Sequence, residues 1–329
     1  MLKINKSLIV FIILFFTILA TLIISLNLGT MSITPTEVWD TVIGNGTAQN
    51  ELVLFDFRLP RMIIAILIGA GMAISGAILQ SVTHNELADP GILGINAGAG
   101  FAVVLFIFFS EGSGTSVFLL PLAALIGATI AATLIYTISW KDGVSPIRLI
   151  LVGIGINSAF SALIIVFQLK MDPTDFMQAT VWLSGSISGT DWRYVLALLP
   201  WIVVFIPVVF YKARTLDTLH LGDETAKGLG TSVERERMFL LFIAVALAGA
   251  SVAVGGAIAF LGLVIPHLAR KLVGARHGVM LPTAALLGAL LLLIADTVGR
   301  NMLAPSEIPV GLVVSVIGGS YFIYLLMKT

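Results

Sequence analysis

Long apolar runs separated by short polar breaks dominate the chain. A bilayer core about 30 Å thick needs roughly 20 apolar residues for one crossing helix. The runs are Ser7–Leu28, Leu59–Thr83, Ile92–Phe109, Val117–Trp140, Ile147–Leu169, Tyr194–Tyr211, Met238–Val254, Ala259–Leu272, Leu281–Val298 and Pro309–Met327. The pattern predicts an all-α polytopic membrane protein with about ten transmembrane helices, in a single transmembrane domain over residues 1–329.

Two stretches predict shorter elements. The run Ala259–Leu272 is short for a full crossing, and its glycines and Pro266 indicate a bent segment buried among other helices. Between two longer runs, Asp172-Pro173-Thr174 has the residue types of a helix start, followed by apolar residues at helical spacing. A short helix near the outer membrane surface is therefore expected after Asp172.

Lysine and arginine positions predict the orientation. With the N-terminus inside, thirteen of the 18 Lys and Arg residues fall on the cytoplasmic side and the other five on the outer side. An excess of positive charge marks the cytoplasmic loops of membrane proteins. Both chain ends and the segment 212–237 are therefore expected in the cytoplasm.

Composition excludes several kinds of chemistry. With 58% hydrophobic and 11% charged residues, the chain has too few charges to cover a soluble globule of 329 residues. Cysteine is absent, which excludes disulfides, thiolate metal sites and cysteine nucleophiles. No G-x-x-x-x-G-K-[ST] loop occurs, so any ATP that drives this protein is hydrolysed by another chain. A metal site is not expected, since the histidines lie on separate segments: His84, His220, His267 and His277.

Acidic residues are almost missing from the apolar runs. Asp296 is the nearest candidate, and it precedes Arg300 by four residues, which permits a pair on one helix face. We favour an ion pair that orients Arg300. The alternative is a proton or sodium site of a secondary carrier.

Two arginines open the second apolar run. Pro60 suits the first turn of a helix, and Arg58 and Arg61, three residues apart, share one face. They either extend to lipid headgroups or pair with carboxylates of an external protein, with Arg300 as a third such group.

The segment 212–237 is the largest polar stretch and holds ten of the 36 Lys, Arg, Asp and Glu residues. Gly222 and Gly228 divide it into two short predicted helices. It is either a solvated loop or, as we favour, a compact element that presses into a groove of a partner protein. Its apolar face is formed by Leu216, Leu219, Leu221, Ala226 and Leu229.

Several stretches carry a family resemblance. They are RLPRMIIAILIGAGMAISGAILQ at 58–80, LADPGILGINAGAG at 87–100, WLSGSISGTDW at 182–192, LGDETAKGLG at 221–230, GGAIAFLGLVIPHLAR at 255–270 and EIPVGLVVSVIGG at 307–319. Through them, the chain closely resembles the membrane permeases of bacterial ABC importers for iron-siderophores, haem and vitamin B12. The stretches run in the family order across nearly the whole chain.

The resemblance implies an assembly and a location. Two permease subunits, identical or paralogous, would surround a path in the bacterial plasma membrane, above an ABC ATPase dimer and below a substrate-binding protein. ATP and Mg would be bound by the ATPase, so the permease itself would be no enzyme and would hold no cofactor or nucleic acid. The expected cargo is an iron-siderophore, with haem or vitamin B12 as alternatives. An ion-coupled secondary carrier is the disfavoured rival.

The resemblance also implies roles for particular residues. Arg58, Arg61 and Arg300 match the positions that dock the binding protein. The short cytoplasmic helices that fit the ATPase match about Thr215–Ser232, and the residues assigned to coupling are Leu219, Leu221, Gly222, Glu224, Ala226, Leu229 and Gly230. The inner gates match Asn85, Leu87, Ser145, Pro146 and Ile147. The chain departs from the family pattern at Glu86, which places a charge beside the first gate, and at Ser320, where the last helix often has proline.

Overall fold

The fold is all-α, as the sequence predicts. The computed structural model describes residues 6–29, 31, 33–91, 94–110, 119–141 and 146–328. Its helical elements are α1 (Lys6–Asn27), α2 (Pro35–Val42), α3 (Ala48–Glu51), the π-helix η1 (Leu52–Arg58), α4 (Leu59–Thr83), α5 (Ile95–Phe109), α6 (Leu119–Ser139), α7 (Pro146–Gln168), α8 (Pro173–Leu183), α9 (Trp192–Tyr211), α10 (Ala213–His220), α11 (Asp223–Gly228), α12 (Val233–Gly255), α13 (Leu261–Val273), α14 (His277–Met302) and α15 (Val310–Lys328).

Each predicted apolar run coincides with a helix. Among the described residues, seven helices are long and apolar enough to cross a membrane: α1, the continuous stretch Ala48–Thr83, α6, α7, α9, α12 and α14. The remaining three runs coincide with the shorter helices α5, α13 and α15.

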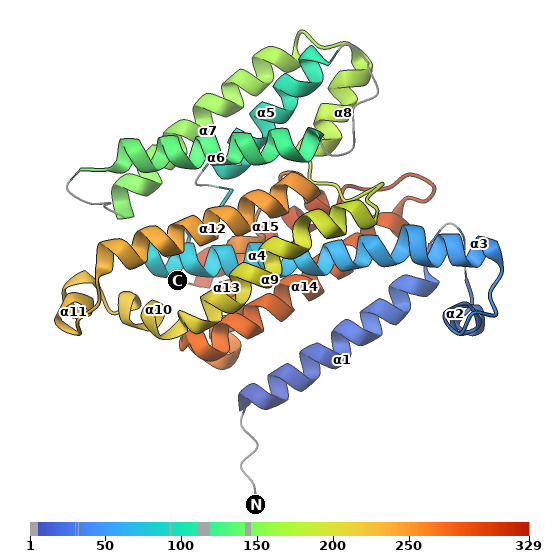
Figure 1. Ribbon diagram of the computed structural model, residues 1–329, viewed down its shortest axis with the longest axis horizontal. Helices are drawn as coiled ribbons and strands as arrows, with labels where there is room; N and C mark the ends of the chain where they lie inside the picture. The colour runs from blue at the N-terminus through green and yellow to red at the C-terminus, as the bar shows by residue number, and fades with distance from the viewer. Residues whose placement is uncertain are drawn as a thin grey trace, which may run out of the picture.

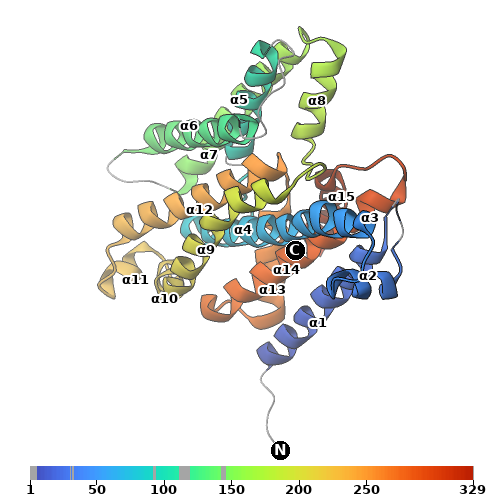
Figure 2. The same ribbon diagram turned by 45° about the vertical axis from the view of Figure 1, so that its right-hand side comes forward.

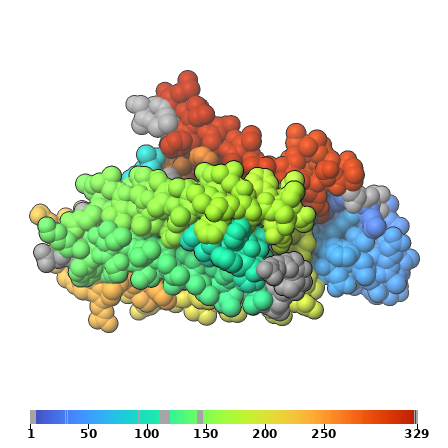
Figure 3. Space-filling view, turned by 90° about the horizontal axis from the view of Figure 1, so that it is seen from above, coloured from blue at the N-terminus to red at the C-terminus, as the bar shows by residue number. Residues whose placement is uncertain are grey.

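Helices α4 and α12 lie at the centre of the bundle, with 78% of the apolar window of each span buried, against 6% for α1 and 17% for α7. Figures 1 and 2 show α4, α9, α12 and α14 side by side, with α5–α8 on one side and α1 on the other. Seen from the α5–α8 side, that layer covers the middle of the molecule, and the N-terminal helices emerge at one end (Figure 3). The peripheral helices expose apolar faces, as expected where a helix meets lipid or a second subunit.

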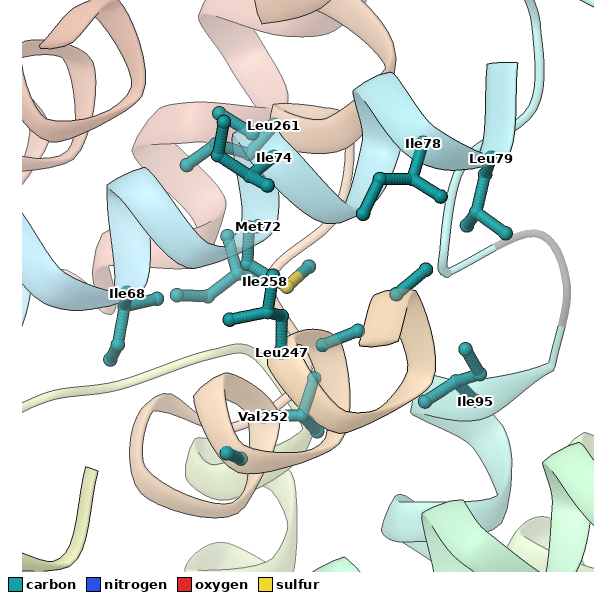
Figure 4. Close-up of a cluster of buried hydrophobic side chains, with 14 of the residues drawn as sticks. Ile68, Met72, Ile74, Ile78, Leu79, Ile95, Leu247, Val252, Ile258 and Leu261 are labelled. Carbon is teal, nitrogen blue, oxygen red and sulfur yellow. The ribbon is translucent and has the colours of Figure 1, made fainter. Parts of the chain in front are cut away.

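The core forms where α4 meets α12 and the α12–α13 connection (Figure 4). Ile68, Met72 and Ile78 of α4 are at most 1% exposed, as are Leu247 and Val252 of α12. Because α4 is apolar around most of its circumference, it can be surrounded by other helices rather than present one stripe to a core.

Glycine pairs let α4 approach its neighbours closely. A Cβ atom at Gly69 would lie 2.3 Å from the carbonyl oxygen of Gly288 on α14, and one at Gly76 would lie 2.0 Å from that of Gly262 on α13. Any side chain at these positions would push the backbones apart, so the glycines set the helix spacing.

The burial of the segment around Pro266 and the helix start at Asp172 are confirmed. Helix α13 follows a non-helical stretch at 256–259, and its first six residues are buried. Asp172 caps α8 by accepting bonds from the backbone N–H groups of Thr174 and Asp175 at 2.9 and 3.0 Å. The sequence did not predict α2, α3 and η1.

Candidate functional site

A charged cluster joins α4, α14 and the α14–α15 connection at one end of the bundle. The Arg61 guanidinium bonds Asp296 Oδ1 at 2.8 Å through Nε and Glu307 Oε2 at 2.9 Å through Nη1. Arg300 Nε lies 3.2 Å from the other oxygen of Asp296. The predicted pairing of Asp296 with Arg300 is confirmed, and Arg61 adds a second cation to the same carboxylate. We call Arg58, Arg61, Asp296, Arg300 and Glu307 the arginine cluster.

Arg58 and Arg61 are directed to different neighbours, although they are only three residues apart. Arg58 is 5% exposed and donates to the backbone carbonyl oxygens of Leu26, at the C-terminal end of α1, and of Met31, in the chain that follows. Gly29 leaves room for this side chain, since a Cβ atom there would lie 2.9 Å from a guanidinium nitrogen of Arg58. Arg58 therefore fastens the chain after α1 to the start of α4.

Arg300 is also held within the chain. Its side chain is 8% exposed, and Nη2 donates to Ser25 Oγ of α1 at 2.6 Å. The three arginines that the sequence places at one end of the molecule are thus brought together and are all bonded internally.

Exposure differs strongly within the arginine cluster. The Asp296 side chain is 0% exposed and the Arg61 side chain 11%, whereas 38% of the Glu307 side chain is exposed. Burial raises the pKa of Glu307, but the charge of Arg61, the hydrogen bonds from Arg61 and Ser188 and the charge of Arg300 together hold that pKa below its ordinary value. Glu307 is therefore an ionised, accessible edge of an otherwise buried cluster.

The segment 212–237 lies at the opposite end and forms the two predicted helices, α10 and α11 (Figure 1). Leu219 and Ala226 are at most 1% exposed and hold the helices to the bundle. Leu221 and Leu229 are 61% and 65% exposed. Glu224 and Gly230 are also exposed, Gly222 is half-buried, and the spaces beside both glycines are open. The apolar face expected from sequence is thus divided into an inward and an outward part.

Three polar residues from different helices meet where α10 packs on the bundle, a contact that the sequence did not predict. Ser81 of α4, His277 of α14 and Asp217 of α10 form a hydrogen-bonded chain, with Ser81 Oγ 2.6 Å from His277 Nε2 and His277 Nδ1 2.7 Å from Asp217 Oδ1. The sequence signal was that Ser81 lies near the end of one apolar run and His277 just before the start of another, which places both on the same side of the bundle.

The residues matched to the gates are partly described. Asn85 Oδ1 accepts the backbone N–H of Leu87 at 2.9 Å in the turn after α4, and Leu87 is 42% exposed. Pro146 begins α7 and Ile147 on its first turn is 72% exposed, whereas Ser145 lies outside the described residues. Glu86, the residue that departs from the family pattern, lies 3.3 Å from His267 Nδ1 and 3.8 Å from Arg270 Nε. Its carboxylate therefore faces an imidazole and a guanidinium group of α13.

Residues 17–328 match the FecCD transport family. The chain belongs to this family. Among its relatives, the iron(3+)-hydroxamate import system permease protein FhuG of Bacillus subtilis is 58% identical, with 99% of this chain and 98% of the relative covered. The iron-uptake system permease protein FeuC of the same organism is 45% identical, over 92% of this chain and 93% of the relative. The hemin transport system permease protein HmuU of Yersinia pestis is 39% identical, over 92% and 91%.

The FecCD fold is also found among solved structures. A chain from an inward-facing metal-chelate type ABC transporter superposes with a TM-score of 0.86 at 31% identity, and the match covers 98% of this chain and 99% of the other. As a FecCD protein, the chain is a transport permease, and the two polar ends of its bundle are the natural places for contact with water-soluble proteins.

Proposed function

We propose that this chain is the permease subunit of an ATP-driven importer for a ferric hydroxamate complex. The observation that carries the proposal is the 58% identity, over 99% of the chain, to a permease of iron(3+)-hydroxamate import. Haem and other ferric chelates are the alternative cargoes, because permeases for them share the family at lower identity. A secondary carrier is disfavoured, since Asp296 is occupied by two arginines and is not open to a coupling ion.

The proposed complex contains a second permease subunit, a dimeric ABC ATPase that binds ATP and Mg, and a substrate-binding protein. Both chain ends and α10–α11 face the cytoplasm of a bacterial cell, and the arginine cluster faces outward. The count of lysine and arginine on the two sides supports this orientation.

Docking of the binding protein is assigned to Arg58, Arg61 and Arg300. Their internal bonds mean that a carboxylate of the binding protein competes with Glu307 for Arg61, while Arg58 and Arg300 supply positive charge from beneath. Glu307 is the natural group to be displaced, because it is the more exposed of the two acids that Arg61 bonds. When a carboxylate of the binding protein replaces Glu307, the net charge around the buried pair of Arg61 and Asp296 stays the same.

Contact with the ATPase is assigned to the outward part of α10–α11. Leu221 and Leu229 project from short helices beside Glu224, and such an exposed apolar pair in a charged surface suits insertion into a groove. The gates are assigned to Asn85 and Leu87 after α4 and to Ser145, Pro146 and Ile147 at the start of α7.

Loss of this chain is expected to abolish uptake of ferric hydroxamates by the bacterium that encodes it. The measurement is accumulation of radioactive iron supplied as a hydroxamate, a catecholate or haem, with the gene deleted and then restored. Hydroxamate uptake should fall to background and recover on restoration, while the other two continue. If hydroxamate uptake is unchanged and haem uptake is lost, the cargo is haem and not a ferric hydroxamate.

Leu221→Asp is expected to release the ATPase from the purified complex without unfolding the permease. The side chain is 61% exposed, so the substitution should change the free energy of unfolding by less than about 0.5 kcal/mol. Co-purification of the ATPase and thermal melting in detergent measure the two effects separately.

Leu219→Asp is the matched control for that variant, two residues earlier and 1% exposed. It should destabilise the permease itself, because it buries a charge with no partner. A Leu221→Asp protein that still holds the ATPase and imports normally would remove α10–α11 from the proposed contact.

A further inference from the structure

Helices α10 and α11 are held by different parts of the bundle. Helix α10 is bonded to α4 and α14, whereas α11 is bonded to α12. Both lie at the same end of the molecule (Figures 1 and 2), yet the chain between them consists of only Leu221 and Gly222.

The side chain of Asp217 fastens α10 to α14. One carboxylate oxygen accepts both the backbone N–H of His277, at 2.8 Å, and its ring Nδ1–H, at 2.7 Å. His277 is the first residue of α14, where backbone N–H groups have no partner within the helix and the helix dipole favours negative charge. Asp217 thus caps α14 from a neighbouring helix.

The same histidine continues the connection into α4. Because a carboxylate only accepts hydrogen bonds, His277 Nδ1 carries a proton, and Nε2 on the other side of the ring lies 2.6 Å from Ser81 Oγ of α4. Ser81 is 0% exposed and its hydroxyl also lies 2.9 Å from the Ala77 carbonyl oxygen. The order Ser–His–Asp resembles a hydrolase triad, but a fully buried hydroxyl cannot meet a substrate, so the chain of bonds is a positioning device.

Two further contacts fix α10 on the same helices. Nε2 of His84, the residue that ends α4 in a left-handed conformation, lies 2.7 Å from the carbonyl oxygen of Leu219. That carbonyl is in the last turn of α10, where it also accepts the backbone N–H of Gly222 at 3.1 Å. Ala213, Leu216 and Leu219 are buried on the inward face of α10, so polar and apolar contacts hold it in the same place.

The corresponding contacts of α11 go to α12. Arg237, whose side chain is 3% exposed, donates to Asp223 Oδ1 at 2.6 Å and to Glu234 Oε1 at 3.0 Å. Asp223 is the first residue of α11. Lys212 bonds Glu236 of α12 at 2.8 Å, but it lies before α10 and fastens the end of α9.

The chain between the two helices is suited to bending. Gly222 has φ +100° and ψ 154°, a conformation that L side chains rarely adopt, and a Cβ atom there would meet nothing within 4 Å. The chain is held here by two backbone bonds, from the Gly222 N–H to the Leu219 carbonyl oxygen at 3.1 Å and from the Ala226 N–H to the Gly222 carbonyl oxygen at 2.9 Å, and not by side-chain packing.

We infer that α10 and α11, which together we call the coupling element, are jointed: α10 moves with α4 and α14, α11 moves with α12, and Gly222 is the joint. Ser81, His277 and Asp217 are the positioning residues of the first half, and Arg237 and Asp223 of the second. The inference rests on the proposed contact with an ATPase. A push on α11 then acts on α12, and motion of α12 relative to α4 and α14 bends the segment at Gly222.

The natural absence of cysteine allows the two halves to be labelled separately. One spin-label pair uses Arg214→Cys on α10 and Gly278→Cys on α14, and the other uses Lys227→Cys on α11 and Arg235→Cys on α12. All four positions are exposed. Each pair is measured by electron paramagnetic resonance in the isolated chain and in the complex with its ATPase, with and without ATP.

Alanine variants of the two anchoring acids, and an asparagine variant of Asp217, separate the halves. Asp217→Ala should broaden the distance distribution of the α10–α14 pair and leave that of the α11–α12 pair unchanged. Asp223→Ala should broaden the distribution of the α11–α12 pair and leave that of the α10–α14 pair unchanged. Asp217→Asn should restore the wild-type distribution, because its amide oxygen can still accept both bonds from His277. A general loss of folding would broaden both pairs, whereas the two alanine variants are expected to broaden one each.

Two results would overturn the inference. One is that either alanine variant broadens both pairs or neither. The other is that ATP changes the α10–α14 or the α11–α12 distance in the wild-type complex, because each half of the segment would then move relative to the helix that is inferred to carry it. Failure of the ATPase to bind would refute the proposed function alone, since the distributions in the isolated chain still decide how α10 and α11 are anchored.

Discussion

Arg61→Glu is expected to lower the free energy of unfolding by about 3–5 kcal/mol, the usual cost of breaking a buried ion pair. The guanidinium bonds Asp296, whose side chain is 0% exposed, and Glu307. The substitution places a third carboxylate against these two, with only Arg300 left to balance Asp296. The melting temperature of the purified permease in detergent measures the effect.

Glu307→Gln is the matched control for the same cluster. Glu307 is 38% exposed, so removal of its charge should cost less than about 1 kcal/mol. It also leaves Asp296 paired with both arginines. If Arg61→Glu melts at the wild-type temperature, the cluster is not the buried network described above, and its arginines are free to serve docking alone.

The helices of the bundle could be predicted from sequence because their signals are local. Twenty apolar residues between polar breaks specify a crossing helix, and Asp172-Pro173 marks the start of α8 without reference to any other segment. The elements within residues 35–58 were not predicted, because their local signals are weak. A π-helix such as η1 has no distinct residue pattern, and α2 and α3 are too short to show a periodicity.

The charged cluster could be predicted only in part. Asp296 and Arg300 are one helical turn apart, so their pairing follows from spacing alone. The bonds from Arg61 to Asp296 and from Arg58 to the chain after α1 join residues far apart in sequence, and they exist only because α14 packs between α1 and α4. For that reason sequence spacing placed the two arginines on one helix face, whereas in the folded chain each is bonded to a different neighbour.

The same limit applies to the coupling element. The two glycines correctly divided it into two helices, since they act on the local backbone. Which of its leucines face outward depends on where the bundle lies beneath them, and this separates Leu219 from Leu221. Ser81, His277 and Asp217 come from three helices, so their meeting could not be read from any one motif.

Gly288→Ala is expected to destabilise the permease by roughly 1–3 kcal/mol, the usual cost of an added methyl group in a packed interior. The new Cβ atom would lie 2.2 Å from the carbonyl oxygen of Gly69 and 2.8 Å from the Cβ atom of Ala73. Since both are fixed parts of α4, α14 must move away. That movement would also strain the bonds that join these helices at their two ends, from Arg61 to Asp296 and from Ser81 to His277.

Gly278→Ala, on the same helix, is the control with the opposite expected sign. A Cβ atom at Gly278 meets nothing within 4 Å, and alanine favours a helix over glycine by up to about 1 kcal/mol. The variant should therefore melt at or above the wild-type temperature, while Gly288→Ala melts below it. If both variants shift the melting temperature upward, helix propensity alone governs α14, and close contact between α4 and α14 does not hold the two ends of the permease together.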